Sequence, residues 1–77
     1  MTSNEIYPGV TVDQAVMAGT LVIAGTRVPV RVVLDHLAAG DIAEDIQAHY
    51  DLTQENIRAT LGYAASIVDA ERVYVVS

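Results

Sequence analysis

The spacing of apolar residues predicts a chain that begins in short strands and continues in helices. Two β-branched segments, residues 9–12 and 20–23, have the composition of strands and are flanked by glycine. The segment between them ends at Gly19 and is expected to act as a connecting turn, so that residues 10–28 form a β-hairpin. Residues 1–9 are expected to be a flexible N-terminal segment.

Three amphipathic helices are expected next. The first begins near Pro29, which suits a first helical turn because its missing N–H has no partner there, and it ends at Gly40. Asp41 is expected to cap the second helix and Thr53 the third. Gly62 costs the third helix about 1 kcal/mol relative to Ala, which indicates a close packing contact. The expected core positions recur three and four residues apart: Val30, Val33, Leu34, Leu37 and Ala38, then Ile42, Ile46 and Tyr50, then Ile57, Leu61, Ala64, Ala65 and Val68.

The end of the chain returns to strand-forming residues. Residues 71–77 are expected to form a C-terminal strand, because an apolar strand left unpaired at a chain end promotes aggregation. It would pair with the chain's own sheet, a second copy's or a partner's. The expected fold class is α+β, mostly α, in one domain over residues 1–77 with a three-helix core at 29–70.

Composition excludes several kinds of chemistry. The chain has 77 residues, no Cys and two His, which excludes disulfides and a closed zinc site. No basic segment precedes an apolar one at the N-terminus, and the longest apolar stretch falls far short of the ~20 residues of a membrane span. We therefore expect a cytoplasmic protein with no membrane association, metal or cofactor.

The two histidines give no indication of catalysis. His36 and His49 stand near no nucleophile elbow and no phosphate-binding glycine loop. Their sequence neighbours Asp35 and Tyr50 are not expected to face them, because adjacent residues of a helix point apart. We expect His36 to be a partly buried or surface residue, and we expect no catalytic residues, no enzyme activity and no small-molecule substrate.

Charge and size point towards association with other proteins. The net charge is −6, and from Asp35 onward there are eight acidic residues against two Arg. Such a chain does not bind nucleic acid through its overall charge, because phosphate neutralisation needs clustered Lys or Arg. A domain this small has a thin core, and a two-stranded hairpin leaves its edges open. We therefore expect a homodimer in which strands pair between copies.

Three segments together resemble one bacterial family. They are "GTRVPV" (25–30), "LAAG" (37–40) and "LTQENIRATLGYA" (52–64), and the chain resembles the DUF433 family over residues 10–68. The resemblance implies a homeodomain-like helix-turn-helix core. It also implies the antitoxin of a type II toxin–antitoxin system, which neutralises a PIN-like nuclease toxin and regulates its own operator DNA.

In the helix-turn-helix interpretation, the third helix enters the major groove of DNA by its first turn. A structural role is the alternative for both charged helix residues: Arg31 would pair with Asp35, and Arg58 with Glu55 or Asp51. The candidate DNA-binding residues are Arg27, Arg31, Thr53, Gln54, Asn56 and Arg58.

The candidate partner-binding residues are Arg72, Val73, Tyr74, Val75 and Val76. A guanidinium can pair bidentately with carboxylates that hold a nuclease's metal and so displace the metal. Arg72 is the first candidate for that role and Arg27 the second; a surface pair with Glu71 or Asp69 is the alternative for Arg72. The alternative function is a protein-interaction or dimerisation module with no DNA binding.

Overall fold

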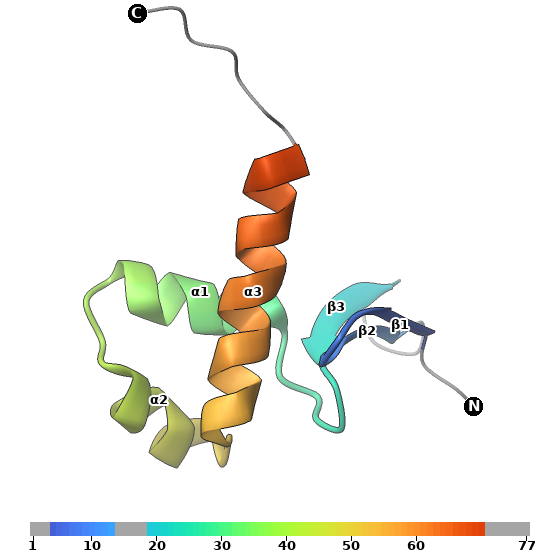
Figure 1. Ribbon diagram of the computed structural model, residues 1–77. Coiled ribbons are helices and arrows are strands. Elements are labelled where there is room, and N and C mark those ends of the chain that lie inside the picture. The colour runs from blue at the N-terminus through green and yellow to red at the C-terminus, as the bar shows by residue number, and fades with distance from the viewer. Residues whose placement is uncertain (1–3, 14–18, 71–77) are drawn as a thin grey trace, which may run out of the picture.

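Three strands and three helices form a mostly helical α+β fold, as expected. The structure is a computed structural model, and it describes residues 4–13 and 19–70. Figure 1 shows the small sheet beside the helices, with the C-terminal end of α3 extending past the other elements. The elements are β1 (Asn4–Tyr7), β2 (Val10–Asp13), β3 (Thr20–Ile23), α1 (Val30–Ala38), α2 (Ala43–Tyr50) and α3 (Gln54–Ala70). The expected turn before Gly19 and the expected C-terminal strand lie outside the described residues.

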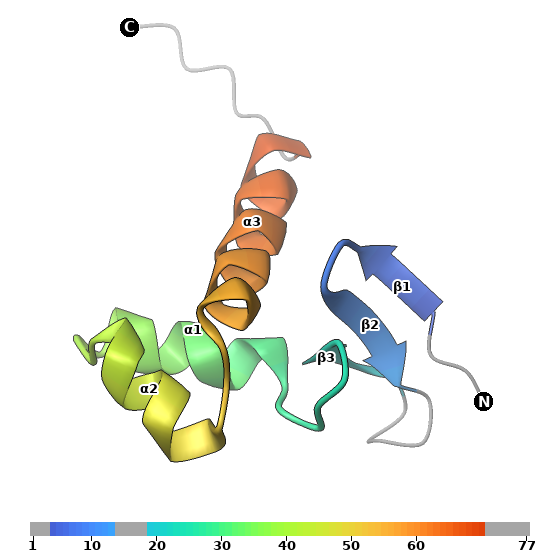
Figure 2. The ribbon, with the colours of Figure 1, turned by 60° about the horizontal axis from the view of Figure 1, so that its bottom comes forward.

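The sheet is antiparallel, in the order β1-β2-β3. The expected hairpin is confirmed as β2 and β3, which pair from Val10 opposite Ile23 to Asp13 opposite Thr20. Within the segment expected to be flexible, residues 4–7 instead belong to the sheet, because β1 pairs with β2 as a third strand; residues 1–3 lie outside the described residues. Pro8 and Gly9 make the turn between them (Figure 2). Gly9 has φ +89°, a conformation that favours glycine, and its N–H donates to the Glu5 carboxylate at 2.8 Å.

The outer edges of this sheet are less open than a two-stranded hairpin would leave them. β2 is paired on both sides. Beyond β3, Val22 forms a bridge with Pro29, and the Ile23 N–H donates to the Val28 carbonyl at 3.0 Å. Proline has no N–H to offer a further strand and is a common way to blunt an edge. Pro29 therefore blunts part of the β3 edge, whereas no described strand pairs with the outer edge of β1, and the dimer formed by strand pairing stays a prediction.

The core lies where the sheet, α1, α2 and the first half of α3 meet. On α1, the buried residues are Val30 and Val33, as expected, whereas Ala38 is exposed. On α2, Ile46 is buried, but Ile42 is exposed because it is the N-cap residue and not part of the helix. The buried apolar cluster consists of Val10, Ile23, Val30, Val33, Ile46, Leu52 and Ile57.

The expected core stripe of α3 is wrong beyond its first member. Ile57 is buried, but Leu61 is 47% exposed and Val68 is 71% exposed. α3 has 17 residues against nine in α1 and eight in α2, so its second half extends past the elements that could cover it. The other buried residue of α3 is Thr60, whose hydroxyl donates to the Asn56 carbonyl at 3.0 Å. No helix in the described ranges has the length and apolar character needed to cross a bilayer.

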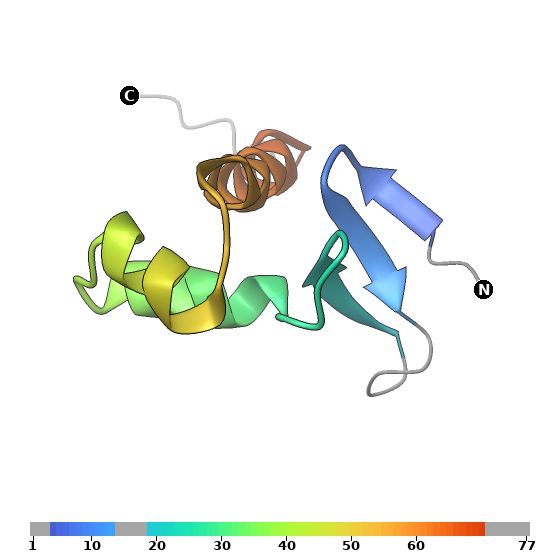
Figure 3. The ribbon, with the colours of Figure 1, turned by 90° about the horizontal axis from the view of Figure 1, so that it is seen from below.

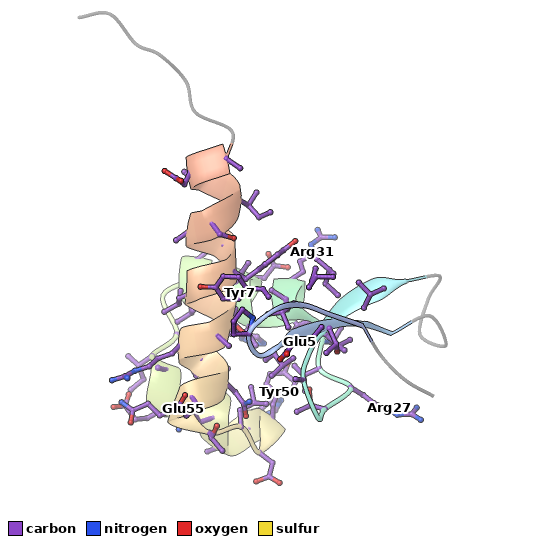
Figure 4. All side chains as sticks on the ribbon, turned by 45° about the vertical axis from the view of Figure 1, so that its right-hand side comes forward. Glu5, Tyr7, Arg27, Arg31, Tyr50 and Glu55 are labelled. Carbon is purple, nitrogen blue, oxygen red and sulfur yellow. The ribbon has the colours of Figure 1, made fainter. Side chains whose placement is uncertain are left out.

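Glycines bring the sheet against α3. The close contact expected at Gly62 is confirmed: a Cβ there would lie 2.5 Å from the Tyr7 hydroxyl oxygen. Tyr7 reaches across α3 from β1 and meets Tyr63 edge-on, with ring centroids 5.9 Å apart (Figure 4). A Cβ at Gly9 would likewise lie 2.5 Å from the Ala59 Cβ. The β1–β2 turn is thus fixed against α3 by residues that lack a side chain.

Candidate functional site

The end of the molecule formed by α1, α2 and the start of α3 is strongly acidic. Residues 35–57 contain six acidic residues and no Lys or Arg. All six side chains belong to exposed residues: Asp35, Asp41, Glu44, Asp45, Asp51 and Glu55. Their mutual repulsion opposes folding, so such a concentration suits a surface that meets a positively charged partner.

A hydrogen-bonded chain of three side chains lies within this acidic end. His36 Nδ1 donates to the Asp41 carboxylate at 2.6 Å, because a carboxylate only accepts. In the neutral ring, Nε2 then accepts from the Tyr50 hydroxyl at 3.0 Å. Asp41 follows α1 and Tyr50 ends α2, so the imidazole ties the two helices together. This chain fixes the orientation of the His36 ring.

His49 completes the wall of a pocket beside this chain. Its ring meets Tyr50 edge-on, with centroids 4.6 Å apart, and lies 6.4 Å from the His36 ring. Asp45 lies one helical turn before His49 on α2. The pocket has a volume of about 230 Å³ and is lined by His36, Asp41, Asp45, Ile46, His49 and Tyr50.

The composition of the pocket limits its chemistry. Among the described residues, no group of three or more His, Asp or Glu side chains is placed to hold a metal ion. The Asp45 carboxylate and the oxygen of Asp41 that His36 does not bind are available to a cation. His49 and Tyr50 also line the pocket, and aromatic rings are side chains on which a guanidinium can stack. This pocket has the features of a receptor for a cationic side chain.

Sequence reasoning missed this pocket. His36 was expected to be partly buried or on the surface, which is confirmed, but its partners Asp41 and Tyr50 are five and 14 residues away. The expectation that Asp41 caps α2 is wrong, because its carboxylate accepts from His36 and the N-cap position belongs to Ile42. His49 and Tyr50 do contact each other. The expectation that Tyr50 does not face His49 is therefore wrong: the two rings meet at the C-terminal end of α2.

Two of the candidate DNA-binding residues are occupied in capping α3. The Asn56 N–H donates to the Thr53 hydroxyl at 3.1 Å, and the Thr53 N–H donates to the Asn56 amide oxygen at 2.8 Å. This is a capping box with Asn in the place usually held by Glu or Gln, and it confirms Thr53 as the N-cap. The cap fixes how both side chains point and uses their oxygens as acceptors, which leaves the Asn56 amide N–H groups and the Thr53 hydroxyl proton for other contacts.

The other candidates lie apart. Arg31 pairs with Asp35 at 3.5 Å, with both side chains exposed, which confirms the expected surface pair. Gln54 and Arg58 are exposed on the first half of α3, and within residues 4–13 and 19–70 Arg58 makes no ion pair with Glu55 or Asp51.

Arg27 extends from the loop after β3, away from the helices, whereas Glu55 marks the first turn of α3 on the other side of the view (Figure 4). The structure therefore does not bring the four remaining candidates together on one surface. They are Arg27, Arg31, Gln54 and Arg58. The candidate partner-binding residues Arg72 to Val76 lie outside the described residues.

Comparison with known proteins gives one match. A family model described as "Protein of unknown function (DUF433)" matches residues 10–64 of the chain. Searches of the curated proteins and of the solved structures each found no match. The matched residues run from β2 into α3 and include the whole of the acidic end described above.

Proposed function

Because the chain belongs to the DUF433 family, whose description assigns no function, we propose one from the surface of the chain itself: an antitoxin-like protein that binds a basic partner protein. The family resemblance implies that the partner is a PIN-like nuclease of a type II toxin–antitoxin system. The observation that carries the proposal is the pocket between α1 and α2, which joins two carboxylates to three aromatic rings. It accepts one arginine or lysine side chain of the partner.

The wider surface supports this mode of binding. A nuclease binds a polyanion, so its substrate cleft carries clustered Lys and Arg. The six exposed carboxylates around the pocket present a complementary field to such a cleft, and complementary fields speed association and select the partner. The acidic end then excludes the nucleic acid by occupying its binding surface. Neutralisation needs no catalysis by this chain.

Co-purification tests the proposal. The chain is co-expressed with the product of the adjacent reading frame, and Asp45→Asn and His49→Ala are compared with the wild type. Each variant should weaken binding by about tenfold, because Asp45→Asn removes a charge contact and His49→Ala a stacking ring at exposed positions. Glu44→Gln is the matched control, because Glu44 is exposed on the same helix but does not line the pocket. Equal weakening by Glu44→Gln and Asp45→Asn would show that the pocket has no specific role.

DNA binding is the second candidate, and the α2–α3 connection favours it. Three residues separate the helices, and Asp51 at the first of them is left-handed, with φ 58° and ψ 48°. A turn of three to four residues is typical of helix-turn-helix motifs. An electrophoretic shift assay with the upstream DNA tests it: Arg58→Ala should weaken binding, and Arg72→Ala should not. No shift with any upstream fragment would leave the protein-binding function alone.

A further inference from the structure

The exposed side of α3 carries an apolar stripe that nothing in the described chain covers. Leu61, Ala65 and Val68 recur four and three residues apart and therefore share one side of the helix. All three are exposed, with Leu61 at 47% and Val68 at 71%. Figure 3, which looks nearly along α3, shows α1 and α2 on one side of it and the sheet on another, with no described element on the remaining side.

Two charges border this stripe. Arg58 and Asp69 are the charged residues between positions 58 and 70. They are 11 residues apart, which is close to three helical turns, so both lie on the same flank of the stripe at about 16 Å from each other along the axis. Both are exposed, and within the described residues neither makes an ion pair. The positive charge is near the start of the stripe and the negative charge is near its end.

We propose that two copies of the chain pair through this stripe with their α3 helices antiparallel. A two-fold axis between Ala64 and Ala65 sets Leu61 opposite Val68 of the second copy, and the small residues at the centre let the helices approach closely. The same axis brings Arg58 of each copy towards Asp69 of the other, because antiparallel helices place residues of the same flank together. A parallel arrangement would instead place this flank of the two copies on opposite sides of the interface, so that Arg58 and Asp69 would not meet.

The dimer goes beyond the proposed function and does not rest on it. The stripe lies on the second half of α3, whereas the pocket lies between α1 and α2, so each surface can be altered without changing the other. Dimerisation through α3 leaves both acidic ends free and makes the complex bivalent, which raises the apparent affinity for a partner that is itself dimeric. It also places Arg58 in an interface, away from DNA.

Charge reversal tests the arrangement by sedimentation equilibrium. Arg58→Glu sets a carboxylate against Asp69 of the other copy, and Asp69→Arg sets a guanidinium against Arg58 of the other copy. Each variant alone should therefore dimerise about tenfold more weakly than the wild type. A heterodimer of the two variants has two such contacts. At one, the two introduced side chains meet and have opposite charges; at the other, the native Arg58 meets the native Asp69. The mixture should therefore form a heterodimer at wild-type strength. Arg27→Glu is the control, because Arg27 is exposed far from α3 and should leave the dimer unchanged.

Each contrary outcome overturns the proposal. A wild type that sediments as a monomer of 8.2 kDa at millimolar concentration would do so directly. So would a dimer that neither reversal weakens, since this would point to a parallel pair or to another interface. If the mixed variants dimerise no more strongly than each variant alone, contacts between Arg58 of one copy and Asp69 of the other are excluded. Circular dichroism of both variants, which change exposed residues, confirms that the helices are retained.

Discussion

Gly9 and Gly25 both have positive φ angles, at +89° and +80°, but only Gly9 faces another element. A Cβ at Gly9 would meet Ala59 at 2.5 Å, whereas no atom of the described residues lies within 4 Å of a Cβ at Gly25. Gly25→Ala should therefore cost about 1–2 kcal/mol for the backbone conformation. Gly9→Ala should lower the free energy of unfolding by the same backbone cost and by about 1–3 kcal/mol more for overpacking against Ala59. Urea unfolding measures both losses. Equal losses would show that the β1–β2 turn does not press on α3.

Thr53 is the residue that begins α3. Thr53→Ala removes the hydroxyl that accepts the Asn56 N–H and should lower the free energy of unfolding by about 1 kcal/mol. Thr53→Ser keeps the hydroxyl and should stay close to the wild type in the same urea titration. If both variants lost stability equally, the methyl group and not the cap would be the stabilising feature.

At the scale of elements, local patterns predicted most of the fold. The strands at Val10–Asp13 and Thr20–Ile23 and the three helices all follow from β-branched runs and helical spacing. β1 could not be found this way, because Ile6 is exposed in it and Tyr7 is its main contact with α3. A Pro-Gly pair before a β-branched run was the signal that would have indicated a second hairpin.

The apolar spacing of α3 correctly predicted residues that share one side of the helix. The prediction that this side belongs to the core is wrong. The spacing of apolar residues shows which of them share a side of the helix, but it does not show which side is covered. Here Gly62 and Tyr63 pack against Tyr7, whereas Leu61 and Val68 lie on an exposed side. The pocket could not be predicted from the sequence for a similar reason. His36 and Tyr50 come together through the angle between α1 and α2, which no local sequence pattern encodes.

The α1–α2 pair itself can be tested through Tyr50. Tyr50→Phe keeps the ring but removes the hydroxyl that donates to His36 Nε2 at 3.0 Å. It should lower the free energy of unfolding by about 0.5–1.5 kcal/mol, the net value of one hydrogen bond, and raise amide exchange in α2. The double variant His36→Ala/Tyr50→Phe should lose less free energy of unfolding than the two single variants lose in sum. Additive losses would mean that the two groups do not interact.

The whole molecule presents two different surfaces, an acidic end and an apolar helix side. With a net charge of −6, binding to a basic partner should be strongly salt-dependent. Raising NaCl from about 0.05 M to about 0.5 M should weaken partner binding by about tenfold or more, measured by calorimetry. Asp45→Asn should reduce this salt dependence more than Glu44→Gln does. A salt-independent affinity would place the contact on an apolar surface instead.

Competition for the nuclease tests the central claim most directly. A fluorescent RNA is bound to the PIN-like nuclease that we propose as the partner, and the chain is titrated in while the anisotropy is followed. If the acidic end occupies the substrate surface, the chain releases the RNA, and the Asp45→Asn/His49→Ala double variant needs about a hundredfold more protein to do so. A chain that binds the nuclease while the RNA stays bound, or a double variant as effective as the wild type, would contradict the account.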